Sequence, residues 1–220
     1  MPGIHYDIAH MLGAVVLLMS FALLYQRRLF AIIQAFALQS VVLAAAAAWQ
    51  GYIQDAPHLY ITALLALSMK AIAIPVALHR VIDRLNIRRT VDTSLGVGPT
   101  MIGGVSLVTL SILLVLPVTA DVTALTREDL ALALSVVLLG LLTMITRRNA
   151  IGQVVGFMSL ENGLILAAIG VEGMPLIVEM LVAFAVMVAF IIFGIFFFHI
   201  RERFDTLDLH TLENFRGERR

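Results

Sequence analysis

Residues 41–48 read VVLAAAAA, an unbroken apolar run within a longer apolar segment that covers residues 30–49. A second such run, IIFGIFFF, occupies residues 191–198. The strands of a membrane-spanning barrel alternate apolar and polar side chains, and neither run does so. Because lipid offers the peptide groups no hydrogen-bond partners, apolar runs of this kind are expected to be helices that cross a bilayer.

The composition extends this interpretation to the whole chain. Of the 220 residues, 60% are hydrophobic and 14% are charged, and the mean hydropathy is +0.98. A soluble domain of this length has no use for so much apolar surface. Crossing the hydrocarbon core takes roughly 20 apolar residues, and about seven segments meet this requirement. They are residues 8–25, 30–49, 59–78, 101–118, 130–145, 151–170 and 176–198. We predict an all-α integral membrane protein with about seven transmembrane helices.

The arginines fall on one side of these predicted spans. They follow spans one, three, five and seven, as Arg27, Arg28, Arg80, Arg84, Arg88, Arg89, Arg147, Arg148, Arg201, Arg203, Arg216, Arg219 and Arg220. The opposite loops contain Arg127 and are otherwise acidic or neutral. By the positive-inside rule, the N-terminus is predicted to lie outside and the C-terminus in the cytoplasm.

The polar loop 119–129 separates four predicted spans from the last three. It divides the chain into an N-terminal four-helix membrane part, residues 1–128, and a C-terminal three-helix part with a cytoplasmic tail, residues 129–220. The link 79–98 begins with an amphipathic run and is expected to lie along the membrane surface. The tail after Arg201 mixes apolar and charged side chains, which fits either docking to a partner or a helix lying on lipid.

Two ionisable residues lie near the middle of predicted spans, where a charge is costly and is usually kept for a purpose. Lys70, the only lysine of the chain, lies midway along the third span. Pro75 follows it and lacks an amide hydrogen, so the carbonyl group of Ala71 is expected to remain free beside the ammonium group. This combination indicates a polar pocket around Lys70.

Glu161 lies at mid-length of the sixth span, within GFMSLENG at residues 156–163. Small residues recur at helical spacing on one side of this span: Gly152, Gly156, Ser159, Gly163, Ala167 and Gly170. Such a stripe lets a neighbouring helix approach closely, and Glu161 points to the opposite side. We therefore expect its carboxylate to face protein or a hydrated cavity, where a buried carboxyl group beside a cation such as Lys70 can take up and release protons.

These polar residues also fit structural roles. Lys70 and Glu161 can form an ion pair that only locks two helices together. Glu179, near the outer end of the seventh span, can be an interfacial carboxylate without chemistry. Gln34 and Gln39 in the second span are expected to join helices rather than to line a pathway.

The remaining signals for chemistry are weak. His79 and His199 lie at cytoplasmic helix ends, where an imidazole suits the helix dipole. His5, Asp7 and His10 have a spacing too unspecific to predict a metal site. Cysteine is absent, so no thiolate can hold an iron–sulfur cluster or zinc. Without a nucleotide-binding glycine loop or a basic domain, we predict no cofactor in this chain and no nucleic-acid partner.

Four segments carry a resemblance to a known family: RRN at 147–149, GFMSLENG at 156–163, HIR at 199–201 and TLDLHTLENFRG at 206–217. Together with Lys70 and Pro75, they resemble hydrogenase-4 component E over nearly the whole chain. From about residue 130 onward the chain also resembles the K subunit of respiratory complex I and the C subunit of multisubunit sodium/proton antiporters.

The resemblance implies a non-catalytic subunit in the membrane arm of a complex I-like assembly, such as a membrane-bound nickel-iron hydrogenase or formate hydrogenlyase, in the bacterial inner membrane. It implies antiporter-like membrane subunits and peripheral redox subunits as partners, with the iron–sulfur clusters and the nickel-iron site in those partners. In the family, the glutamate that matches Glu161 belongs to a chain of ionisable groups and relays protons.

One departure from the family bears on this role. The K subunit carries a second buried glutamate in its last helix, whereas residues 182–188 are entirely apolar here. Glu179 is the nearest acidic residue, so the predicted relay consists of Glu161, Lys70 and Glu179. The alternatives are a structural scaffold subunit without an ion path and a subunit of a multisubunit cation/proton antiporter.

Overall fold

The computed structural model describes residues 2–85, 95–118 and 124–170, and its elements there are helices joined by short turns. In chain order the elements are α1 (Pro2–Tyr25), α2 (Leu29–Ile53), α3 (Pro57–Leu65), the π-helix η1 (Ala66–Ala73), α4 (Ile74–Leu85), α5 (Val97–Val118), α6 (Ala124–Thr146) and α7 (Ala150–Gly170). All of them belong to one unit, Met1–Ala183. The predicted seventh span, Glu179, His199 and the tail lie outside the described residues.

Six helical stretches in the described part are long and apolar enough to cross a membrane. They are Ile4–Tyr25, Leu29–Ile53, Pro57–Asp83, Val97–Pro117, Glu128–Thr146 and Ala150–Gly170. Each coincides, apart from a few residues at its ends, with one of the first six predicted segments. The helical class is therefore confirmed for this part of the chain.

The third stretch continues further than the sequence indicated, because α3, η1 and α4 follow one another without a break. Leu78, Val81 and Ile82 are buried, whereas Arg80 and Asp83 are exposed. Apolar residues at this spacing extend the buried face of the same helix. Residues 79–85 therefore continue the third helix and do not begin a separate link, while their predicted place at the membrane surface stays a prediction. Residues 86–94 of that link lie outside the description.

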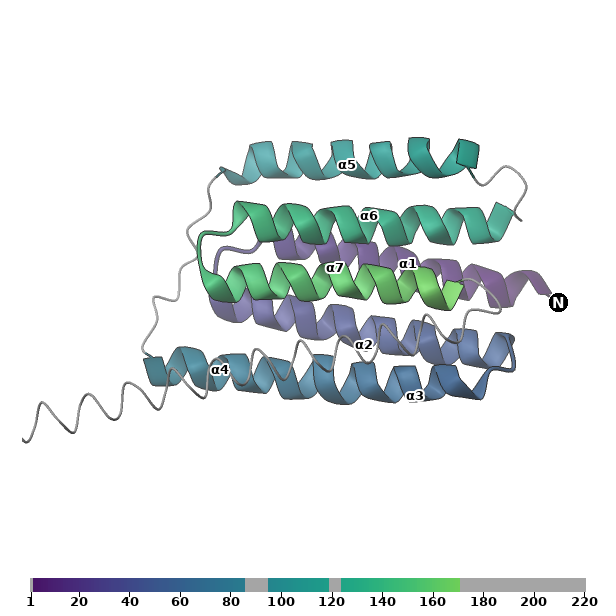
Figure 1. Cartoon of the computed structure of the whole chain (residues 1–220), viewed down its shortest axis with the longest axis horizontal. Helices are drawn as coiled ribbons and strands as arrows, with labels where there is room; N and C mark the ends of the chain where they lie inside the picture. Colours follow the sequence, from purple (N-terminus) through teal and green to yellow (C-terminus); the bar gives the residue numbers. More distant parts are fainter. Residues whose placement is uncertain (1, 86–94, 119–123, 171–220) are drawn as a thin grey trace, which may run out of the picture. The chain divides into compact units, whose positions relative to one another are not determined.

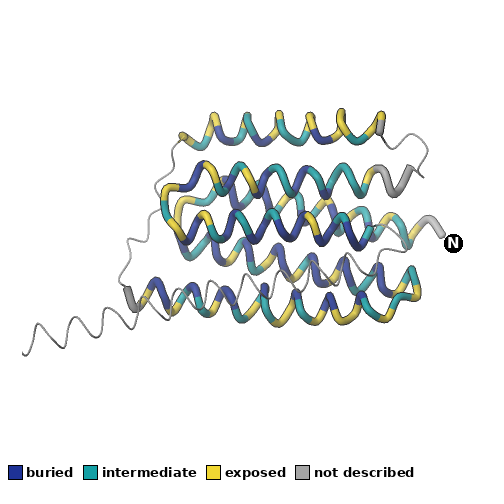
Figure 2. Tube along the Cα trace, viewed as in Figure 1, coloured by how far each residue is buried: buried dark blue, intermediate teal, exposed yellow. Residues whose placement is uncertain are grey.

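The helices run side by side, with α1, α2, α6 and α7 in the middle (Figure 1). The edge helix α5 packs on α6 and α1, and the α3–η1–α4 stretch packs on α2 at the other edge. Figure 2 shows how burial follows this order: α7 is mostly buried, whereas α5 is exposed along much of its length. Within the most apolar 18 residues of α7, 61% are buried, whereas 17% are buried within the corresponding 18 residues of α5.

An apolar core joins five of the helices beside the polar residues described below. Its fully buried members are Val16 of α1, Leu43 and Ala47 of α2, Leu59 of α3, Ala133 and Val136 of α6, and Ile165 and Ile169 of α7. The predicted division at residue 128 stays a prediction. Within the described part, α6 and α7 pack directly against α1 and α2.

Candidate functional site: a buried ion pair and its hydrogen-bond network

Lys70 and Glu161, predicted from their depth in apolar segments, meet inside the helix bundle. Lys70 is 3% exposed and Glu161 is 1% exposed. The Lys70 Nζ atom lies 3.2 Å from Glu161 Oε2. The same Nζ donates a 2.9 Å hydrogen bond to Asn162 Oδ1. The structure therefore brings together two of the three predicted relay residues, while Glu179 lies outside the described residues.

The π-helix η1 carries Lys70 to this position. The amide of Ile74 donates to the carbonyl of Met69, five residues earlier, which is the π-helical pattern. Pro75 follows immediately, and a proline ring disturbs the helical turn before it because it lacks an amide hydrogen and collides with a carbonyl group. Sequence reasoning predicted a polar pocket around Lys70 and a free carbonyl group at Ala71, but not a π-helix of eight residues.

The two sides of α7 explain why Glu161 faces Lys70. A Cβ atom added to Gly156 would lie 2.6 Å from the amide nitrogen of Met144, and one added to Gly163 would lie 2.7 Å from that of Val137. Only glycine permits this approach of α7 to α6, so the predicted small-residue stripe is confirmed at these two positions. Glu161, on the other side, is directed toward η1.

Ser159 departs from that prediction. It was assigned to the stripe that faces the neighbouring helix, but its hydroxyl accepts a 3.0 Å hydrogen bond from Gln39 Nε2 of α2. Ser159 lies at the border between the face of α7 that carries the glycines and the face that carries the polar side chains. The next residue, Leu160, contacts Gly140 of α6. Ser159 therefore belongs to the polar network.

Gln39 is the centre of this network. Its amide nitrogen also donates to Ser20 Oγ of α1 at 2.8 Å, and its oxygen accepts from Asn162 Nδ2 at 3.2 Å. Asn162 makes a further 3.4 Å contact with Ser40 Oγ. An unbroken hydrogen-bond path thus leads from Lys70 through Asn162 and Gln39 to α1. The prediction that Gln39 joins helices is confirmed, whereas Gln34 is exposed.

Sequence reasoning missed Asn162, Ser20 and Ser40 as members of the site. The available signal was Asn162 itself, an amide beside a glutamate in an apolar segment, where an unpaired polar group is costly. The serines carried no comparable signal, because a helical serine can bond its own backbone. Ser20 and Ser40 do so as well, through the carbonyls of Val16 and Phe36.

The carboxylate of Glu161 is the least satisfied group of the network. Within the described residues, neither oxygen accepts a hydrogen bond, and the contact with Lys70 is its ion pair. A carboxylate can accept several hydrogen bonds, and a buried one is costly when they are not made. Chemically, the pair can exist as ammonium and carboxylate or as amine and carboxylic acid, and it can gain or lose one proton from either form.

Arg147, predicted only as a cytoplasmic cation, is buried to 2% exposure at the turn between α6 and α7. Its guanidinium group donates to the carbonyls of Leu23, Leu24 and Gln26 at the end of α1, at 2.6, 3.0 and 2.8 Å. Burial, and then the charge of Arg27, lowers the pKa of Arg147. The last carbonyl groups of a helix have no partner within the helix, so the arginine satisfies groups at the end of α1.

His5, His10 and His79 make their contacts outside the network. His79 Nδ1 is 2.7 Å from the carbonyl of Pro75, and its ring packs on Phe30. His5 packs on the rings of Trp49 and Tyr52. His10 contacts carboxylates of α6 rather than His5 or Asp7. Among the described residues, no group of three potential ligands could hold a metal ion.

A comparison with known proteins finds an uncharacterized protein of Mycobacterium tuberculosis that is 27% identical over 201 residues. The alignment covers 90% of this chain and 91% of that protein. No family model matches the chain, and no solved structure matches it. Because the name of the relative carries no activity, the function is argued below from the buried ion pair.

Proposed function

We propose that the chain is a multi-pass subunit in the membrane arm of a complex I-like assembly, a membrane-bound nickel-iron hydrogenase or formate hydrogenlyase. In this assembly it contributes one station to redox-driven translocation of protons or sodium ions. The Lys70–Glu161 pair carries the proposal, because it is almost fully buried among helices that are long and apolar enough to cross a membrane. Ionisable groups at such depth are typical of ion pathways.

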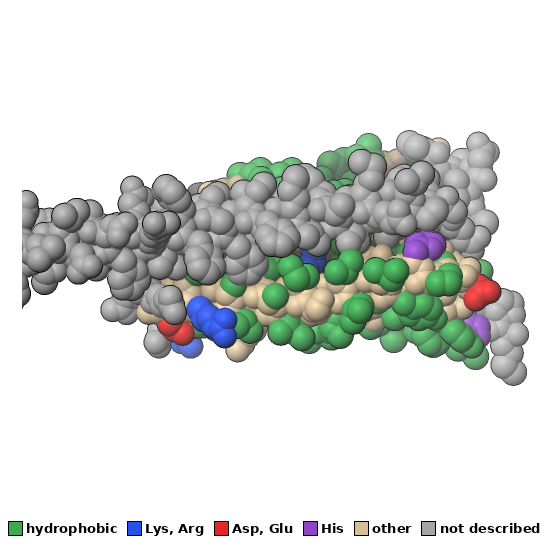
Figure 3. All heavy atoms as spheres, turned by 60° about the horizontal axis from the view of Figure 1, so that its bottom comes forward, with side chains coloured by type: hydrophobic (Ala, Val, Ile, Leu, Met, Phe, Trp, Pro, Cys, Tyr) green, Lys and Arg blue, Asp and Glu red, His purple; other side chains and the backbone are tan. Residues whose placement is uncertain are grey.

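The proposed topology has seven spans, with the N-terminus outside and the C-terminus in the cytoplasm of a bacterial cell. Two arginine-containing turns support it, because Arg147 of the α6–α7 turn bonds to Gln26 of the α1–α2 turn, so both turns lie at one end of the bundle. Figure 3 shows a group of basic side chains toward one end of the visible face, beside an acidic one, and a further basic side chain in the hydrophobic middle. This charge distribution is the one that the positive-inside rule favours for a cytoplasmic end.

In the proposed mechanism, Glu161 is the group that gains and loses the proton, and Lys70 stabilises its ionised form. When the Glu161 carboxylate takes up a proton, the pair changes from neutral to singly positive. Movement of the Lys70 ammonium away from Oε2 favours this uptake, and its return favours release. The redox chemistry belongs to partner subunits, which hold the iron–sulfur clusters and the nickel-iron site. Glu179 is proposed as a further station.

A specific observation also favours the scaffold alternative. The hydrogen bonds of Gln39 and Asn162 join α1, α2, η1 and α7, and the close contact of α7 with α6 adds a fifth element. A network of this kind specifies one helix arrangement whether or not protons move through it. The relay and the scaffold differ in one respect: only the relay requires a titratable group at position 161.

The experiment that separates them is Glu161→Gln in the native host, with assembly of the complex and redox-driven proton translocation in membrane vesicles as readouts. The amide keeps the shape of the side chain and removes its titration. We expect the complex to assemble and translocation to fall. Ser68→Ala, on the exposed side of η1, is the matched control and is expected to leave both readouts unchanged.

Two outcomes contradict the relay. If Glu161→Gln assembles and translocates normally, the chain is a scaffold. If Glu161→Gln fails to assemble and the double variant Lys70→Met/Glu161→Gln restores both assembly and translocation, the pair only holds helices together. Affinity purification of the tagged chain tests the partners, which we expect to include hydrogenase subunits. A purified chain that exchanges cations for protons on its own would favour an antiporter instead.

A further inference from the structure

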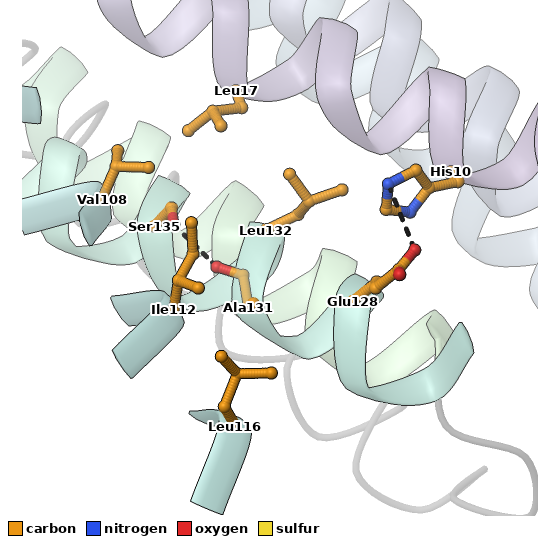
Figure 4. A pocket seen from close by; sticks show the side chains of 9 residues that line it. All are labelled: His10, Leu17, Val108, Ile112, Leu116, Glu128, Ala131, Leu132 and Ser135. Atoms are coloured by element: carbon orange, nitrogen blue, oxygen red, sulfur yellow. Dashed lines mark hydrogen bonds and ion pairs between the residues drawn. The ribbon is translucent and has the colours of Figure 1, made fainter. Parts of the chain in front are cut away.

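A pocket of about 320 Å³ lies between α1, α5 and α6 (Figure 4). Pockets of this size accommodate small ligands or parts of larger ones. Most of its wall consists of the aliphatic side chains of Leu17, Val108, Ile112, Leu116 and Leu132. No residue of the Lys70–Glu161 network lines it.

One end of the pocket is polar and charged. Figure 4 shows His10 of α1 and Glu128 of α6 facing each other. The His10 Nε2 atom lies 3.6 Å from Glu128 Oε2, and Nδ1 lies 3.3 Å from Oδ1 of Asp129. The side chains of Glu128 and His10 are 58% and 37% exposed, so a ligand can reach them. Two acidic side chains therefore meet one imidazole at this end of the pocket.

The rest of the pocket offers no free polar group among the described residues that line it. The hydroxyl of Ser135 donates to the carbonyl of Ala131 at 2.7 Å. Ser111 donates to the same carbonyl from α5 at 2.9 Å. Because these groups are already paired, the wall beyond His10 and Glu128 presents hydrocarbon. The pocket therefore fits an amphipathic molecule with a cationic head and an apolar chain.

The position of the pocket matches a lipid in one leaflet. His10 and Leu17 on α1, like Glu128 and Ser135 on α6, are separated by seven positions in the sequence, or about 10 Å along a helix. This is about a third of the hydrocarbon core of a bilayer. Glu128 is the first residue of the membrane-length stretch of α6. In the topology proposed above, on which this inference rests, that end faces the outer surface.

We propose that this pocket binds an outer-leaflet phospholipid with an ethanolamine head, its ammonium group at Glu128 and His10 and one acyl chain against Leu17, Ile112 and Leu132. The head decides the selectivity. An acyl chain gains little when it leaves the bilayer for an equally apolar pocket. An ammonium group at the Glu128 carboxylate, by contrast, gains an attraction that a glycerol head does not.

The test uses the full chain in nanodiscs of equal parts palmitoyl-oleoyl phosphatidylethanolamine and phosphatidylglycerol, followed by mass analysis of the lipid retained after mild detergent extraction. We expect the ethanolamine lipid to be enriched roughly fivefold over the glycerol lipid. Glu128→Gln is expected to lower this enrichment. Leu132→Trp and Ile112→Phe, which fill the pocket from two helices, are expected to lower the total retained lipid.

The matched control is Ile102→Trp on α5, because Ile102 is 71% exposed and does not line the pocket, and it is expected to leave retention unchanged. Equal retention of the two lipids, or unchanged retention in both pocket-filling variants while their helical circular dichroism is native, overturns the proposal. If the chain is not a membrane protein at all, it will be absent from the membrane fraction, and this result is distinct from a loss of lipid selectivity. Loss of lipid selectivity alone would leave the relay of Glu161 untouched.

Discussion

The two sides of α7 pack against their neighbouring helices in different ways. Toward α6, Gly156 and Gly163 leave no side chain between the helices, so that backbone lies against backbone. Toward α2 and η1, the polar side chains of Glu161, Asn162 and Ser159 fill the space and bond to Lys70 and Gln39. On the first side the glycines permit close contact because they lack side chains, and on the second side an ion pair and hydrogen bonds hold the helices together.

This difference teaches which substitutions each side tolerates. Any atom added at a close backbone contact destabilises the fold through overpacking, whether or not the added group is charged. A buried ion pair with its hydrogen bonds resists the loss of one partner, because the other charge then remains buried and uncompensated. Only the polar side can change its charge without a change of shape, which is the property that a proton station needs.

The largest effect is expected from Lys70→Met, which leaves the Glu161 carboxylate buried without its cation. We expect a loss of about 3–5 kcal/mol in the free energy of unfolding, measured by denaturation of the purified chain in detergent micelles. The double variant Lys70→Met/Glu161→Gln is expected to recover most of this loss, since no charge remains. If the double variant is as unstable as the single one, the ion pair is not the source of the effect.

A smaller effect is expected on the other side from Gly156→Ala, since the added Cβ would lie 2.6 Å from the Met144 amide nitrogen. We expect it to cost about 1–3 kcal/mol, visible as a lower midpoint of thermal unfolding. Gly98→Ala is the control, because a Cβ atom there meets nothing within 4 Å. Equal midpoints for the two variants would contradict the close contact of α6 and α7.

Gln39→Leu tests the hydrogen bonds on the polar side of α7, because leucine has a similar volume but forms none of them. Ser159, Ser20 and Asn162 each lose a partner, and we expect a destabilisation of about 1–3 kcal/mol in the same denaturation assay. Gln34→Leu, on the exposed side of α2, is expected to change stability by less than about 0.5 kcal/mol. A larger loss of stability for Gln34→Leu than for Gln39→Leu would contradict the burial of Gln39 and the exposure of Gln34.

The smallest effect is expected from Ser68→Ala on the exposed side of η1. Its hydroxyl bonds only within the same helix, to the carbonyls of Leu64 and Leu65. We expect unfolding free energy to change by less than about 0.5 kcal/mol. A strong loss of stability here would contradict the exposed position of Ser68.

The helices and the ion pair could be predicted from the sequence because both follow from the cost of polar groups in an apolar environment. Long apolar segments require internally bonded backbone, and a lone lysine and a glutamate within them require each other or water. These rules need no knowledge of which helices are neighbours. They located six helical stretches and the two buried charges at the centre of the site.

The remaining features depend on neighbours and were therefore missed. Sequence reasoning placed Arg147 on the cytoplasmic side of the spans but gave it no partner, whereas the structure shows that it donates to carbonyl groups of α1. The π-helix before Pro75 and the continuation of α4 to Leu85 were also missed, and both elements pack against α2. Ser20 and Ser40 acquire their roles only when α2 and α7 are in place.

The capping of α1 by Arg147 has a consequence for the order in which the protein is made. Leu23, whose carbonyl receives the shortest of these bonds, precedes Arg147 by 124 positions. During synthesis the first helix is therefore inserted long before the residue that completes its end emerges from the ribosome. A nascent chain halted before Arg147 keeps three carbonyl groups without their donors, so early fragments are expected to be substrates for quality-control proteases until the α6–α7 turn arrives.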